Sequence, residues 1–363
     1  MARTQRCELR IHYNTGWDHR ITVRGDRFPL NWESGVDAAW GEGNVWTYTW
    51  ETDQPGAIAF KILFDDDVWA HGSNGFIRPG ESLDVYPYFF HTAGSIDHVH
   101  HFDTPIHIYK PPSYEENYDK AYPVIYIHDG QNLFDPEFAF RGQTWSVDQA
   151  LNRMLGEGLM DEVIAVGVFN RGAGRLNDYT PSYDPNFLGV GAGGGAGQYA
   201  DFLINEIKPF IDTHYRTLPQ PRHTGLMGAS LGGLVSLYMA RRWPFVFSKV
   251  ASLSSSFWWN NRNLLQDVVR SNKYVPLKIY LDVGTQNDGL PETRAMYQAL
   301  IQLGYRPGTD LFYFVAQQHA HSEAFWGARV HLPLRLLFPA WSTHAPEPPF
   351  DAVAMEETVE SAS

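Results

Sequence analysis

Residues 223–242 read HTGLMGASLGGLVSLYMARR and combine two kinds of local pattern. The first half is a short apolar run typical of a buried strand, and the second half is compatible with a helix. Between them, Gly228-Ala-Ser230-Leu-Gly232 matches G-x-S-x-G, a sharp strand-to-helix turn that exposes a serine hydroxyl. Small residues are needed because side chains at the two glycines would collide with the crossing backbone. The segment predicts a nucleophile turn, and a serine that only caps a helix is the alternative.

Apolar strands and helices alternate on both sides of this segment. Strand-like runs occur at 106–110, 123–130, 163–169, 250–255, 277–285 and 311–316, and helical patterns occur at 146–155, 198–211 and 292–304. Most of the strands are apolar enough to be buried on both faces, as in a parallel sheet covered by helices. The sequence therefore predicts an α/β domain with a mainly parallel central sheet over residues 104–338.

The two ends of the chain lack this alternation of strands and helices. Residues 1–95 contain short runs that alternate apolar and polar side chains and are separated by Gly-containing turns, which predicts a small all-β sandwich. Residues 339–363 are rich in proline and acidic residues, which predicts a disordered tail.

Composition narrows the classes of function. The net charge is −13 and no Lys/Arg tract is present, which argues against nucleic acid or an anionic membrane as a partner. Cys7 is the only cysteine, so no disulfide and no cysteine-based zinc site is expected. No apolar run resembles a secretory signal or a membrane span. We expect a cytoplasmic protein without a cofactor, and the oligomeric state stays open.

A serine nucleophile needs a histidine to take its proton and a carboxylate to orient that histidine. In this architecture the chain order is Ser, then Asp or Glu, then His. Asp282 and Asp288 lie in or after the strand at 277–285, and His319 and His321 follow the strand at 311–316. Both pairs lie toward the carboxyl ends of strands, where open α/β sheets build their sites.

Four stretches together carry a resemblance: GASLGG, YIHDGQNLFD at 126–135, LDVGTQND and HSEAFW. They resemble the putative esterase family of α/β-hydrolases, which includes enterochelin esterases, esterase D and several feruloyl esterases. The resemblance implies the α/β-hydrolase fold, Ser230 as nucleophile and His321 as base. The family's acid commonly falls at the position of Asn287 here, so we choose Asp288, which follows it. Asp282 and Glu292 are the alternatives.

The same resemblance implies an oxyanion hole made of two backbone N–H groups, those of Leu231 and Gln131. The segment from about 171 to 197 is expected to be a mobile loop that covers the serine, or else an exposed connection. Side chains that would border the substrate, or that have a structural role instead, are Asp129, Gly130, Arg175, Tyr179, Trp258 and Trp259.

Two further patterns are set aside. Gly189-x-Gly191-x-x-Gly194 matches a dinucleotide fingerprint but does not follow an apolar strand, so NAD binding is not predicted. His98 and His100 share a face in DHVHH, but no third ligand is apparent nearby, so a metal site is not predicted either.

In the N-terminal module, VRGDRFPLNW at 23–32 and FKILFDDDVWAHGSNGFI at 60–77 resemble β-sandwiches of the starch- and glycogen-binding type or of the early-set type. Tryptophans on it would bind a glycan, or the module only packs on the hydrolase domain and borders its mouth. The leading hypothesis is a serine carboxylic-ester hydrolase acting on small-molecule esters with short-chain or aromatic acyl groups. An acyltransferase with the same triad, and a glycan-binding protein with a vestigial site, are the alternatives.

Overall fold

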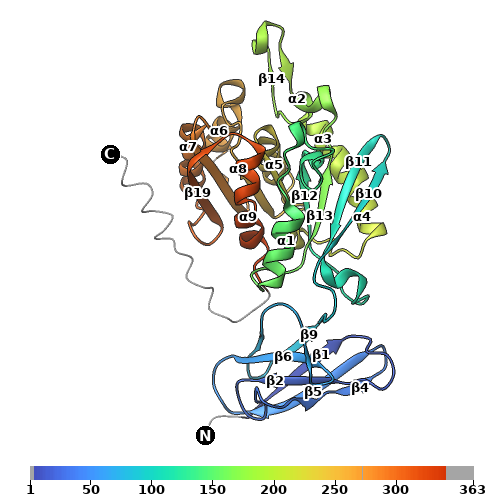
Figure 1. The fold of residues 1–363 in the computed structure, drawn as a ribbon. Coiled ribbons are helices and arrows are strands. Elements are labelled where there is room, and N and C mark those ends of the chain that lie inside the picture. Colours follow the sequence, from blue (N-terminus) through green and yellow to red (C-terminus); the bar gives the residue numbers. More distant parts are fainter. Residues whose placement is uncertain (1–3, 272, 341–363) are drawn as a thin grey trace.

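The computed structural model describes residues 4–271 and 273–340. It contains a small β-sandwich and a larger domain built on one central sheet, with the helices on both faces of that sheet (Figure 1). Most of the tail for which disorder is predicted, residues 341–363, lies outside the described residues.

The small domain consists of two sheets packed face to face. One has the order β4 (Ala39–Gly41), β5 (Val45–Thr52), β1 (Gln5–His12) and β9 (Ser82–Val85). The other has the order β3 (Val36–Asp37), β2 (Ile21–Gly25), β6 (Ile58–Phe64) and β7 (Val68–Trp69), and β8 (Gly75–Ile77) pairs with β6. The alternating residues Leu9 and Ile11 point into the core together with Trp46 and Trp50, because successive side chains of a strand face opposite ways.

The central sheet has eight strands. Their order is β10 (Ser95–His101), β11 (Thr104–Lys110), β13 (Ile164–Val168), β12 (Val124–His128), β16 (Thr224–Ala229), β17 (Lys249–Leu253), β18 (Lys278–Gln286) and β19 (Leu311–Ala320). Only the pairs β10–β11 and β11–β13 are antiparallel. The strand-helix alternation in the sequence is therefore realised as a mainly parallel sheet, and the predicted fold class is confirmed.

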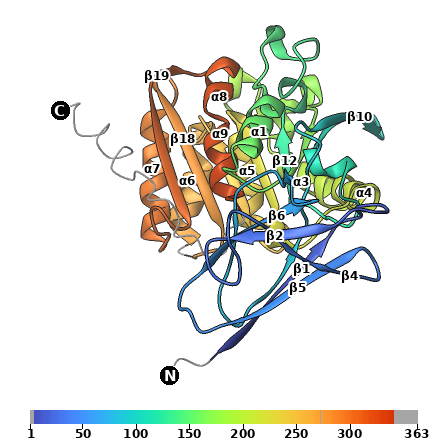
Figure 2. The same cartoon turned by 60° about the horizontal axis from the view of Figure 1, so that its bottom comes forward.

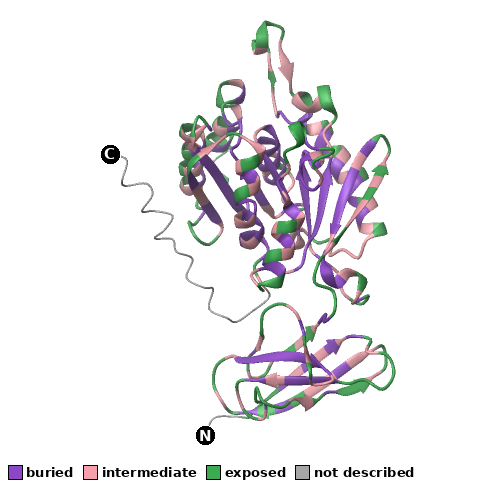
Figure 3. Cartoon of the chain, viewed as in Figure 1, coloured by how far each residue is buried: buried purple, intermediate pink, exposed green. Residues whose placement is uncertain are grey.

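The strands of the central sheet are mostly buried, because helices cover both faces of the sheet (Figure 3). In β12, Val124 and Tyr126 join one hydrophobic cluster, whereas Ile125 and Ile127 join the other. The first cluster includes residues of α3 (Ala196–Phe202), α4 (Lys208–His214), α5 (Leu231–Arg242), α6 (Trp259–Ser271) and α7 (Leu290–Gln302). The second includes residues of α1 (Val147–Gly156), α8 (Glu323–Arg329) and α9 (His331–Leu337). Across residues 4–271 and 273–340, no helix combines the length and apolarity that crossing a membrane requires.

The sandwich lies against the amino ends of the parallel strands (Figures 1 and 2). A cavity of about 470 Å³ between the domains is bordered by Pro123 and His223, which immediately precede β12 and β16, and by Lys61 and Tyr88 of the N-terminal part. The nucleophile turn is at the opposite, carboxyl edge of the sheet. The expectation that the module borders the mouth of the hydrolase site is therefore wrong.

Candidate active site

Ser230 is the single residue between β16 and α5. Its backbone has φ 60° and ψ −125°, a strained conformation for a side chain with a Cβ. The turn is tight: a Cβ added to Gly228 would lie 2.5 Å from the carbonyl carbon of Gly232. Three backbone hydrogen bonds hold Ser230. Its N–H donates to Leu253 O at 3.0 Å, and its carbonyl accepts from the N–H groups of Ser256 at 3.0 Å and Leu234 at 3.1 Å. Its hydroxyl oxygen lies 3.3 Å from Ser256 Oγ.

His321 and Asp288 contact each other at the same edge of the sheet. His321 follows β19, and its Nδ1 lies 2.6 Å from Oδ1 of Asp288, which follows β18. The carboxylate of Asp288 is fully buried, whereas the imidazole is partly exposed. A carboxylate in this position fixes the orientation of the imidazole that it contacts.

The alternative acid and base, Asp282 and His319, instead contact Arg329. The guanidinium donates from Nε to Asp282 Oδ2 at 2.9 Å and from Nη2 to Oδ1 at 3.1 Å. His319 Nδ1 lies 3.3 Å from Arg329 Nη1. Burial and the charge of Arg329 lower the pKa of His319.

A second tight turn follows β12, at Asp129 to Gln131. Asp129 has φ 59°, and residues 130–132 form one turn of 3₁₀ helix. A Cβ on Gly130 would lie 2.3 Å from the carbonyl carbon of Gly167, so only glycine fits. This turn adjoins the nucleophile turn, because a Cβ on Gly232 would be 3.4 Å from Asp129 Oδ2.

Polar side chains support the turn at Asp129. Arg175 donates from Nε and Nη2 to the two carboxylate oxygens of Asp129, each at 2.7 Å, and Asn170 Nδ2 donates to Oδ1 at 2.7 Å. The Asp129 N–H donates to the hydroxyl of Tyr179 at 3.1 Å. Next to it, burial lowers the pKa of His128 to about 4.

The side chains expected to border the substrate differ in exposure. Tyr179 and Trp259 are buried in the core, so neither presents surface to a ligand here. Trp258 is 49% exposed, and Arg175 is partly buried in its ion pair with Asp129. Asp129 and Gly130 are buried.

The segment at 171–197 contains the short helix α2 (Arg175–Asp178) and a hairpin of β14 (Tyr183–Asp184) and β15 (Ala192–Gly193). The hairpin projects at the end of the domain opposite the sandwich (Figure 1). Arg171 pairs with Asp178, and Trp259 Nε1 donates to Ser182 O at 2.9 Å. Arg175 of this segment pairs with Asp129 in the β12 turn, and Ser182 accepts from Trp259 at the start of α6, so the segment is anchored at both places.

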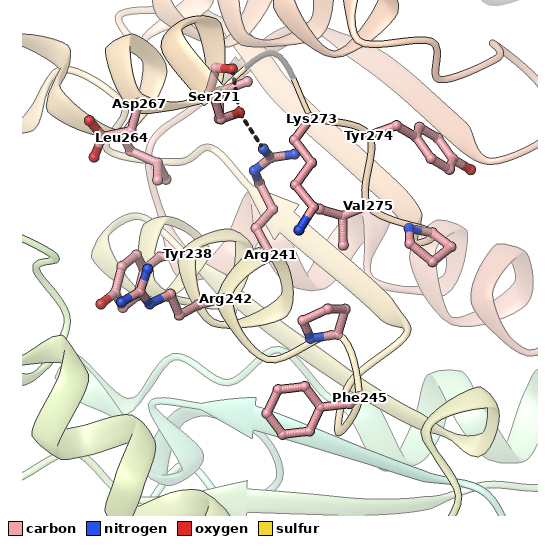
Figure 4. Close-up of a pocket in the computed structure, with 13 residues that line it drawn as sticks. Tyr238, Arg241, Arg242, Phe245, Leu264, Asp267, Ser271, Lys273, Tyr274 and Val275 are labelled. Carbon is pink, nitrogen blue, oxygen red and sulfur yellow. Dashed lines mark hydrogen bonds between the residues drawn. The ribbon is translucent and has the colours of Figure 1, made fainter.

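Another cavity, of about 550 Å³, lies away from this edge (Figure 4). It is lined by Arg241 and Arg242 at the end of α5 and by Phe245 and Lys273. Since α5 has 12 residues and begins at Leu231, a helical rise of about 1.5 Å per residue puts this cavity roughly 18 Å from the nucleophile turn. It is separate from the candidate active site.

No three His, Cys, Asp or Glu side chains are grouped as metal ligands in the part of the chain that the structure describes. In the histidine-rich strand, the ring of His98 packs on that of His107, with ring centroids 4.0 Å apart. Burial lowers the pKa of His107 to about 4.

Sequence reasoning missed the polar residues beneath the site, namely Ser254, Ser256, Arg329, Asn170 and Tyr199. Ser254 and Ser256 lie in the run SSS after β17, and Arg329 is the last residue of α8, the helix that begins within HSEAFW. The position of the serine run after a strand end was the one available signal. The contact between Ser254 and Arg329 spans 75 residues of sequence and leaves no local pattern.

Comparison with known proteins gives a family and a fold. Residues 100–329 match the sequence model of a family described as "Putative esterase". YbbA, an uncharacterised protein of Bacillus subtilis, is 25% identical over 213 residues, which cover 54% of this chain and 78% of YbbA. A siderophore enterobactin esterase of Emericella nidulans is 33% identical over 79 residues, covering 22% of this chain and 26% of that protein.

Among solved structures, the enterobactin esterase of Shigella flexneri superimposes with a TM-score of 0.54 at 15% identity, over 88% of this chain and 87% of that one. A ferulic acid esterase gives 0.50 at 18% identity, over 68% of this chain and 97% of that one. At sequence identities of 15% and 18%, these superpositions show that the fold is shared and do not establish a shared substrate.

Proposed function

Because the chain belongs to the putative esterase family, it is a carboxylic ester hydrolase, and we propose that it acts through an acyl-enzyme formed on Ser230. The observation that carries the proposal is the hydrogen bond between His321 and Asp288 at the sheet edge where the partly buried Ser230 lies. An isolated serine hydroxyl is a poor nucleophile, so this pair supplies what the serine lacks.

In the proposed reaction, Ser230 Oγ attacks the acyl carbon of the ester while Nε2 of His321 takes the hydroxyl proton. The tetrahedral intermediate collapses, the bond from the acyl carbon to the alcohol oxygen breaks, and His321 returns the proton to the leaving alcohol. Water then attacks the acyl-enzyme with His321 again as base, and the carboxylic acid is released. Asp288 accepts from Nδ1–H throughout and stabilises the imidazolium as it forms.

The negative charge on the ester oxygen is proposed to be stabilised by the N–H groups of Leu231 and Gln131. Each lies in the first turn of a helical segment, where backbone N–H groups have no partner within the helix. The two turns adjoin each other, as the approach of Gly232 to Asp129 requires. Donors fixed in advance are worth most in such a site, because they need no reorganisation during the reaction.

The proposed substrate is an ester with a short-chain or aromatic acyl group. Trp258 is the exposed aromatic side chain closest in sequence to the strand end of β17, and a flat indole surface suits an aryl group. The Arg175 guanidinium, which pairs with Asp129 beside the Ser230 turn, is proposed to favour polar or anionic substituents over a long aliphatic chain. Proteins similar to this chain are named as a siderophore enterobactin esterase and a ferulic acid esterase.

The test measures hydrolysis of p-nitrophenyl esters of increasing chain length, together with methyl ferulate. Ser230→Ala should lower kcat by several orders of magnitude and prevent labelling by a fluorophosphonate. His321→Ala should behave in the same way, whereas His319→Ala, the matched control two residues away, should retain most activity. Unlabelled wild-type Ser230, or full activity in His321→Ala, would refute the assignment.

We propose in addition that the sandwich binds a glycan through Trp32 and Trp69. Their ring centroids are 6.4 Å apart with an angle of 31° between the planes, and both rings are partly exposed. Sugar rings stack on such surfaces. Trp69→Ala should abolish binding of soluble starch measured by calorimetry, with the exposed Trp17→Ala as control. Equal binding by wild type and Trp69→Ala would reject this role.

A further inference from the structure

A buried chain of hydrogen bonds runs from Asp282 to the proposed catalytic histidine. Arg329 is 2% exposed and holds Asp282 through two hydrogen bonds. Its Nη2 also donates to Ser254 Oγ at 2.6 Å. Ser254 Oγ in turn lies 2.5 Å from Oδ2 of Asp288, whose Oδ1 contacts His321.

The chemistry of the partners fixes the direction of each hydrogen bond. A guanidinium only donates, so Ser254 Oγ must accept from Arg329. A serine hydroxyl has one hydrogen, and the remaining neighbour, Asp288, is a carboxylate that accepts. Arg329 therefore orients the Ser254 hydroxyl so that its hydrogen points at Asp288.

The Asp288 carboxylate is held by opposite contacts on its two oxygens. Oδ2 accepts from Ser254 Oγ and from the Gly284 N–H, both at 2.5 Å, and Arg329 Nη2 is 3.7 Å away. Oδ1 is left for the imidazole at 2.6 Å. With Oδ2 fixed on one side, the carboxylate cannot rotate away from His321.

We infer that Ser254 and Arg329 are positioning residues, which act on the reaction by holding the Asp288 carboxylate in the orientation that His321 requires. The inference rests on the proposed function, because it assumes that Asp288 serves the histidine. Neither side chain needs to touch the substrate. Hydrogen bonds to charged groups in a buried site are among the stronger ones, and loss of this one leaves the carboxylate both less fixed and less stabilised.

The experiment compares Ser254→Ala with Ser252→Ala. Both serines belong to the same buried strand end, but Ser252 Oγ bonds to Gly233 O and Ser255 Oγ and has no contact with Asp288. Ser254→Ala should lower kcat on p-nitrophenyl acetate by about 10- to 100-fold with KM nearly unchanged. Ser252→Ala should leave kcat within about threefold. Ser254→Gly serves as a second variant, because Ser254 has φ 41° and glycine relieves that backbone strain.

A double-mutant cycle separates positioning from a structural role. If Ser254 acts through Asp288, Ser254→Ala should cost little further kcat once Asp288→Asn is present, so the two effects are not additive. Full additivity, an effect on KM alone, or wild-type kcat in both Ser254 variants would overturn the inference. These results differ from failure of the proposed function, which would appear as activity that survives Ser230→Ala.

Discussion

Gly130→Ala places a methyl group where the backbone leaves no room. The added Cβ would lie 2.3 Å from Gly167 C, 2.4 Å from Gly167 O and 2.6 Å from Val168 N. All three atoms belong to the main chain of β13, so no side chain can rotate out of the way. Either β13 or the turn that presents Gln131 has to move.

The expected cost to stability is moderate, and the cost to catalysis is larger. An extra methyl group in a tightly packed site destabilises by about 1–3 kcal/mol, which for a domain of this size lowers the melting temperature by roughly 2–12 °C. A typical stability of about 5–15 kcal/mol leaves most of the protein folded at 25 °C. Displacing one oxyanion donor lowers kcat by about 10²- to 10³-fold.

The assay measures kcat on p-nitrophenyl acetate at 25 °C and the melting temperature of the same samples. The control is Gly197→Ala in α3, where an added Cβ has no neighbour within 4 Å and alanine favours the helix by up to about 1 kcal/mol. It should keep wild-type kcat. If Gly130→Ala keeps kcat within threefold of wild type, the 130–131 turn does not supply the oxyanion donor.

The remaining predictions concern the acid, the domain contact and pH. Asp288→Asn should lower kcat by about 10⁴-fold. Asp282→Asn should retain a higher kcat and mainly lower the midpoint of urea unfolding. The reverse pattern would make Asp282 the acid. Glu116 accepts hydrogen bonds from the N–H groups of Phe89, Phe90 and His91 and from the Tyr13 hydroxyl. Glu116→Ala should therefore speed proteolysis of the chain between the two domains and leave kcat unchanged. An unaltered rate of cleavage would contradict this. Burial lowers the folded pKa of His128 to about 4, below the unfolded value of about 6.5. Between these values the unfolded chain binds one more proton, so up to about 3 kcal/mol of the stability present above pH 6.5 is lost as pH falls toward 4. Equal midpoints of urea unfolding at pH 7 and pH 4.5 would refute this.

The fold was predictable because its signals are local. The Ser230 turn needs glycine at position 228, where an added Cβ would lie 2.5 Å from the carbonyl carbon of Gly232. The collision expected at Gly232 is wrong, because the nearest atoms to a Cβ there are 3.4 Å away, an ordinary contact distance. Strands buried on both faces must be apolar throughout, as in the all-buried segments of β12, β13 and β16. Such requirements leave a pattern within a few neighbouring residues, and the alternation of these patterns specifies a parallel sheet.

The contacts within the site were not predictable to the same extent. Asp282 and Asp288 come from the same strand and its end, and His319 and His321 are two residues apart, so spacing does not tell them apart. The structure shows that Arg329 engages Asp282 and lies beside His319, and that Asp288 faces His321. The edge at which the sandwich packs was equally unpredictable, because it depends on contacts between residues far apart in the sequence, such as the hydrogen bond from Tyr13 to Glu116.

Backbone strain is concentrated along the carboxyl edge of the sheet. Four neighbouring strands, β12, β16, β17 and β18, are each followed at once by a non-glycine residue with positive φ: Asp129 at 59°, Ser230 at 60°, Ser254 at 41° and Asn287 at 50°. Each such residue costs on the order of 1–3 kcal/mol. Glycine would remove that cost at every one of these positions.

At three of them the side chain makes a contact or has a role that glycine cannot provide. Asp129 binds Arg175 and Asn170, Ser254 donates to Asp288, and Ser230 presents the proposed nucleophile. Asn287 has no such role in the proposal, and asparagine is among the residues that tolerate this conformation best. It comes directly before Asp288, the proposed acid. Asn287→Gly should therefore leave stability unchanged or raise it, without loss of kcat. Ser254→Gly should relieve the backbone strain but lower kcat. A gain in stability with a loss of activity is expected only where the strained residue serves the reaction.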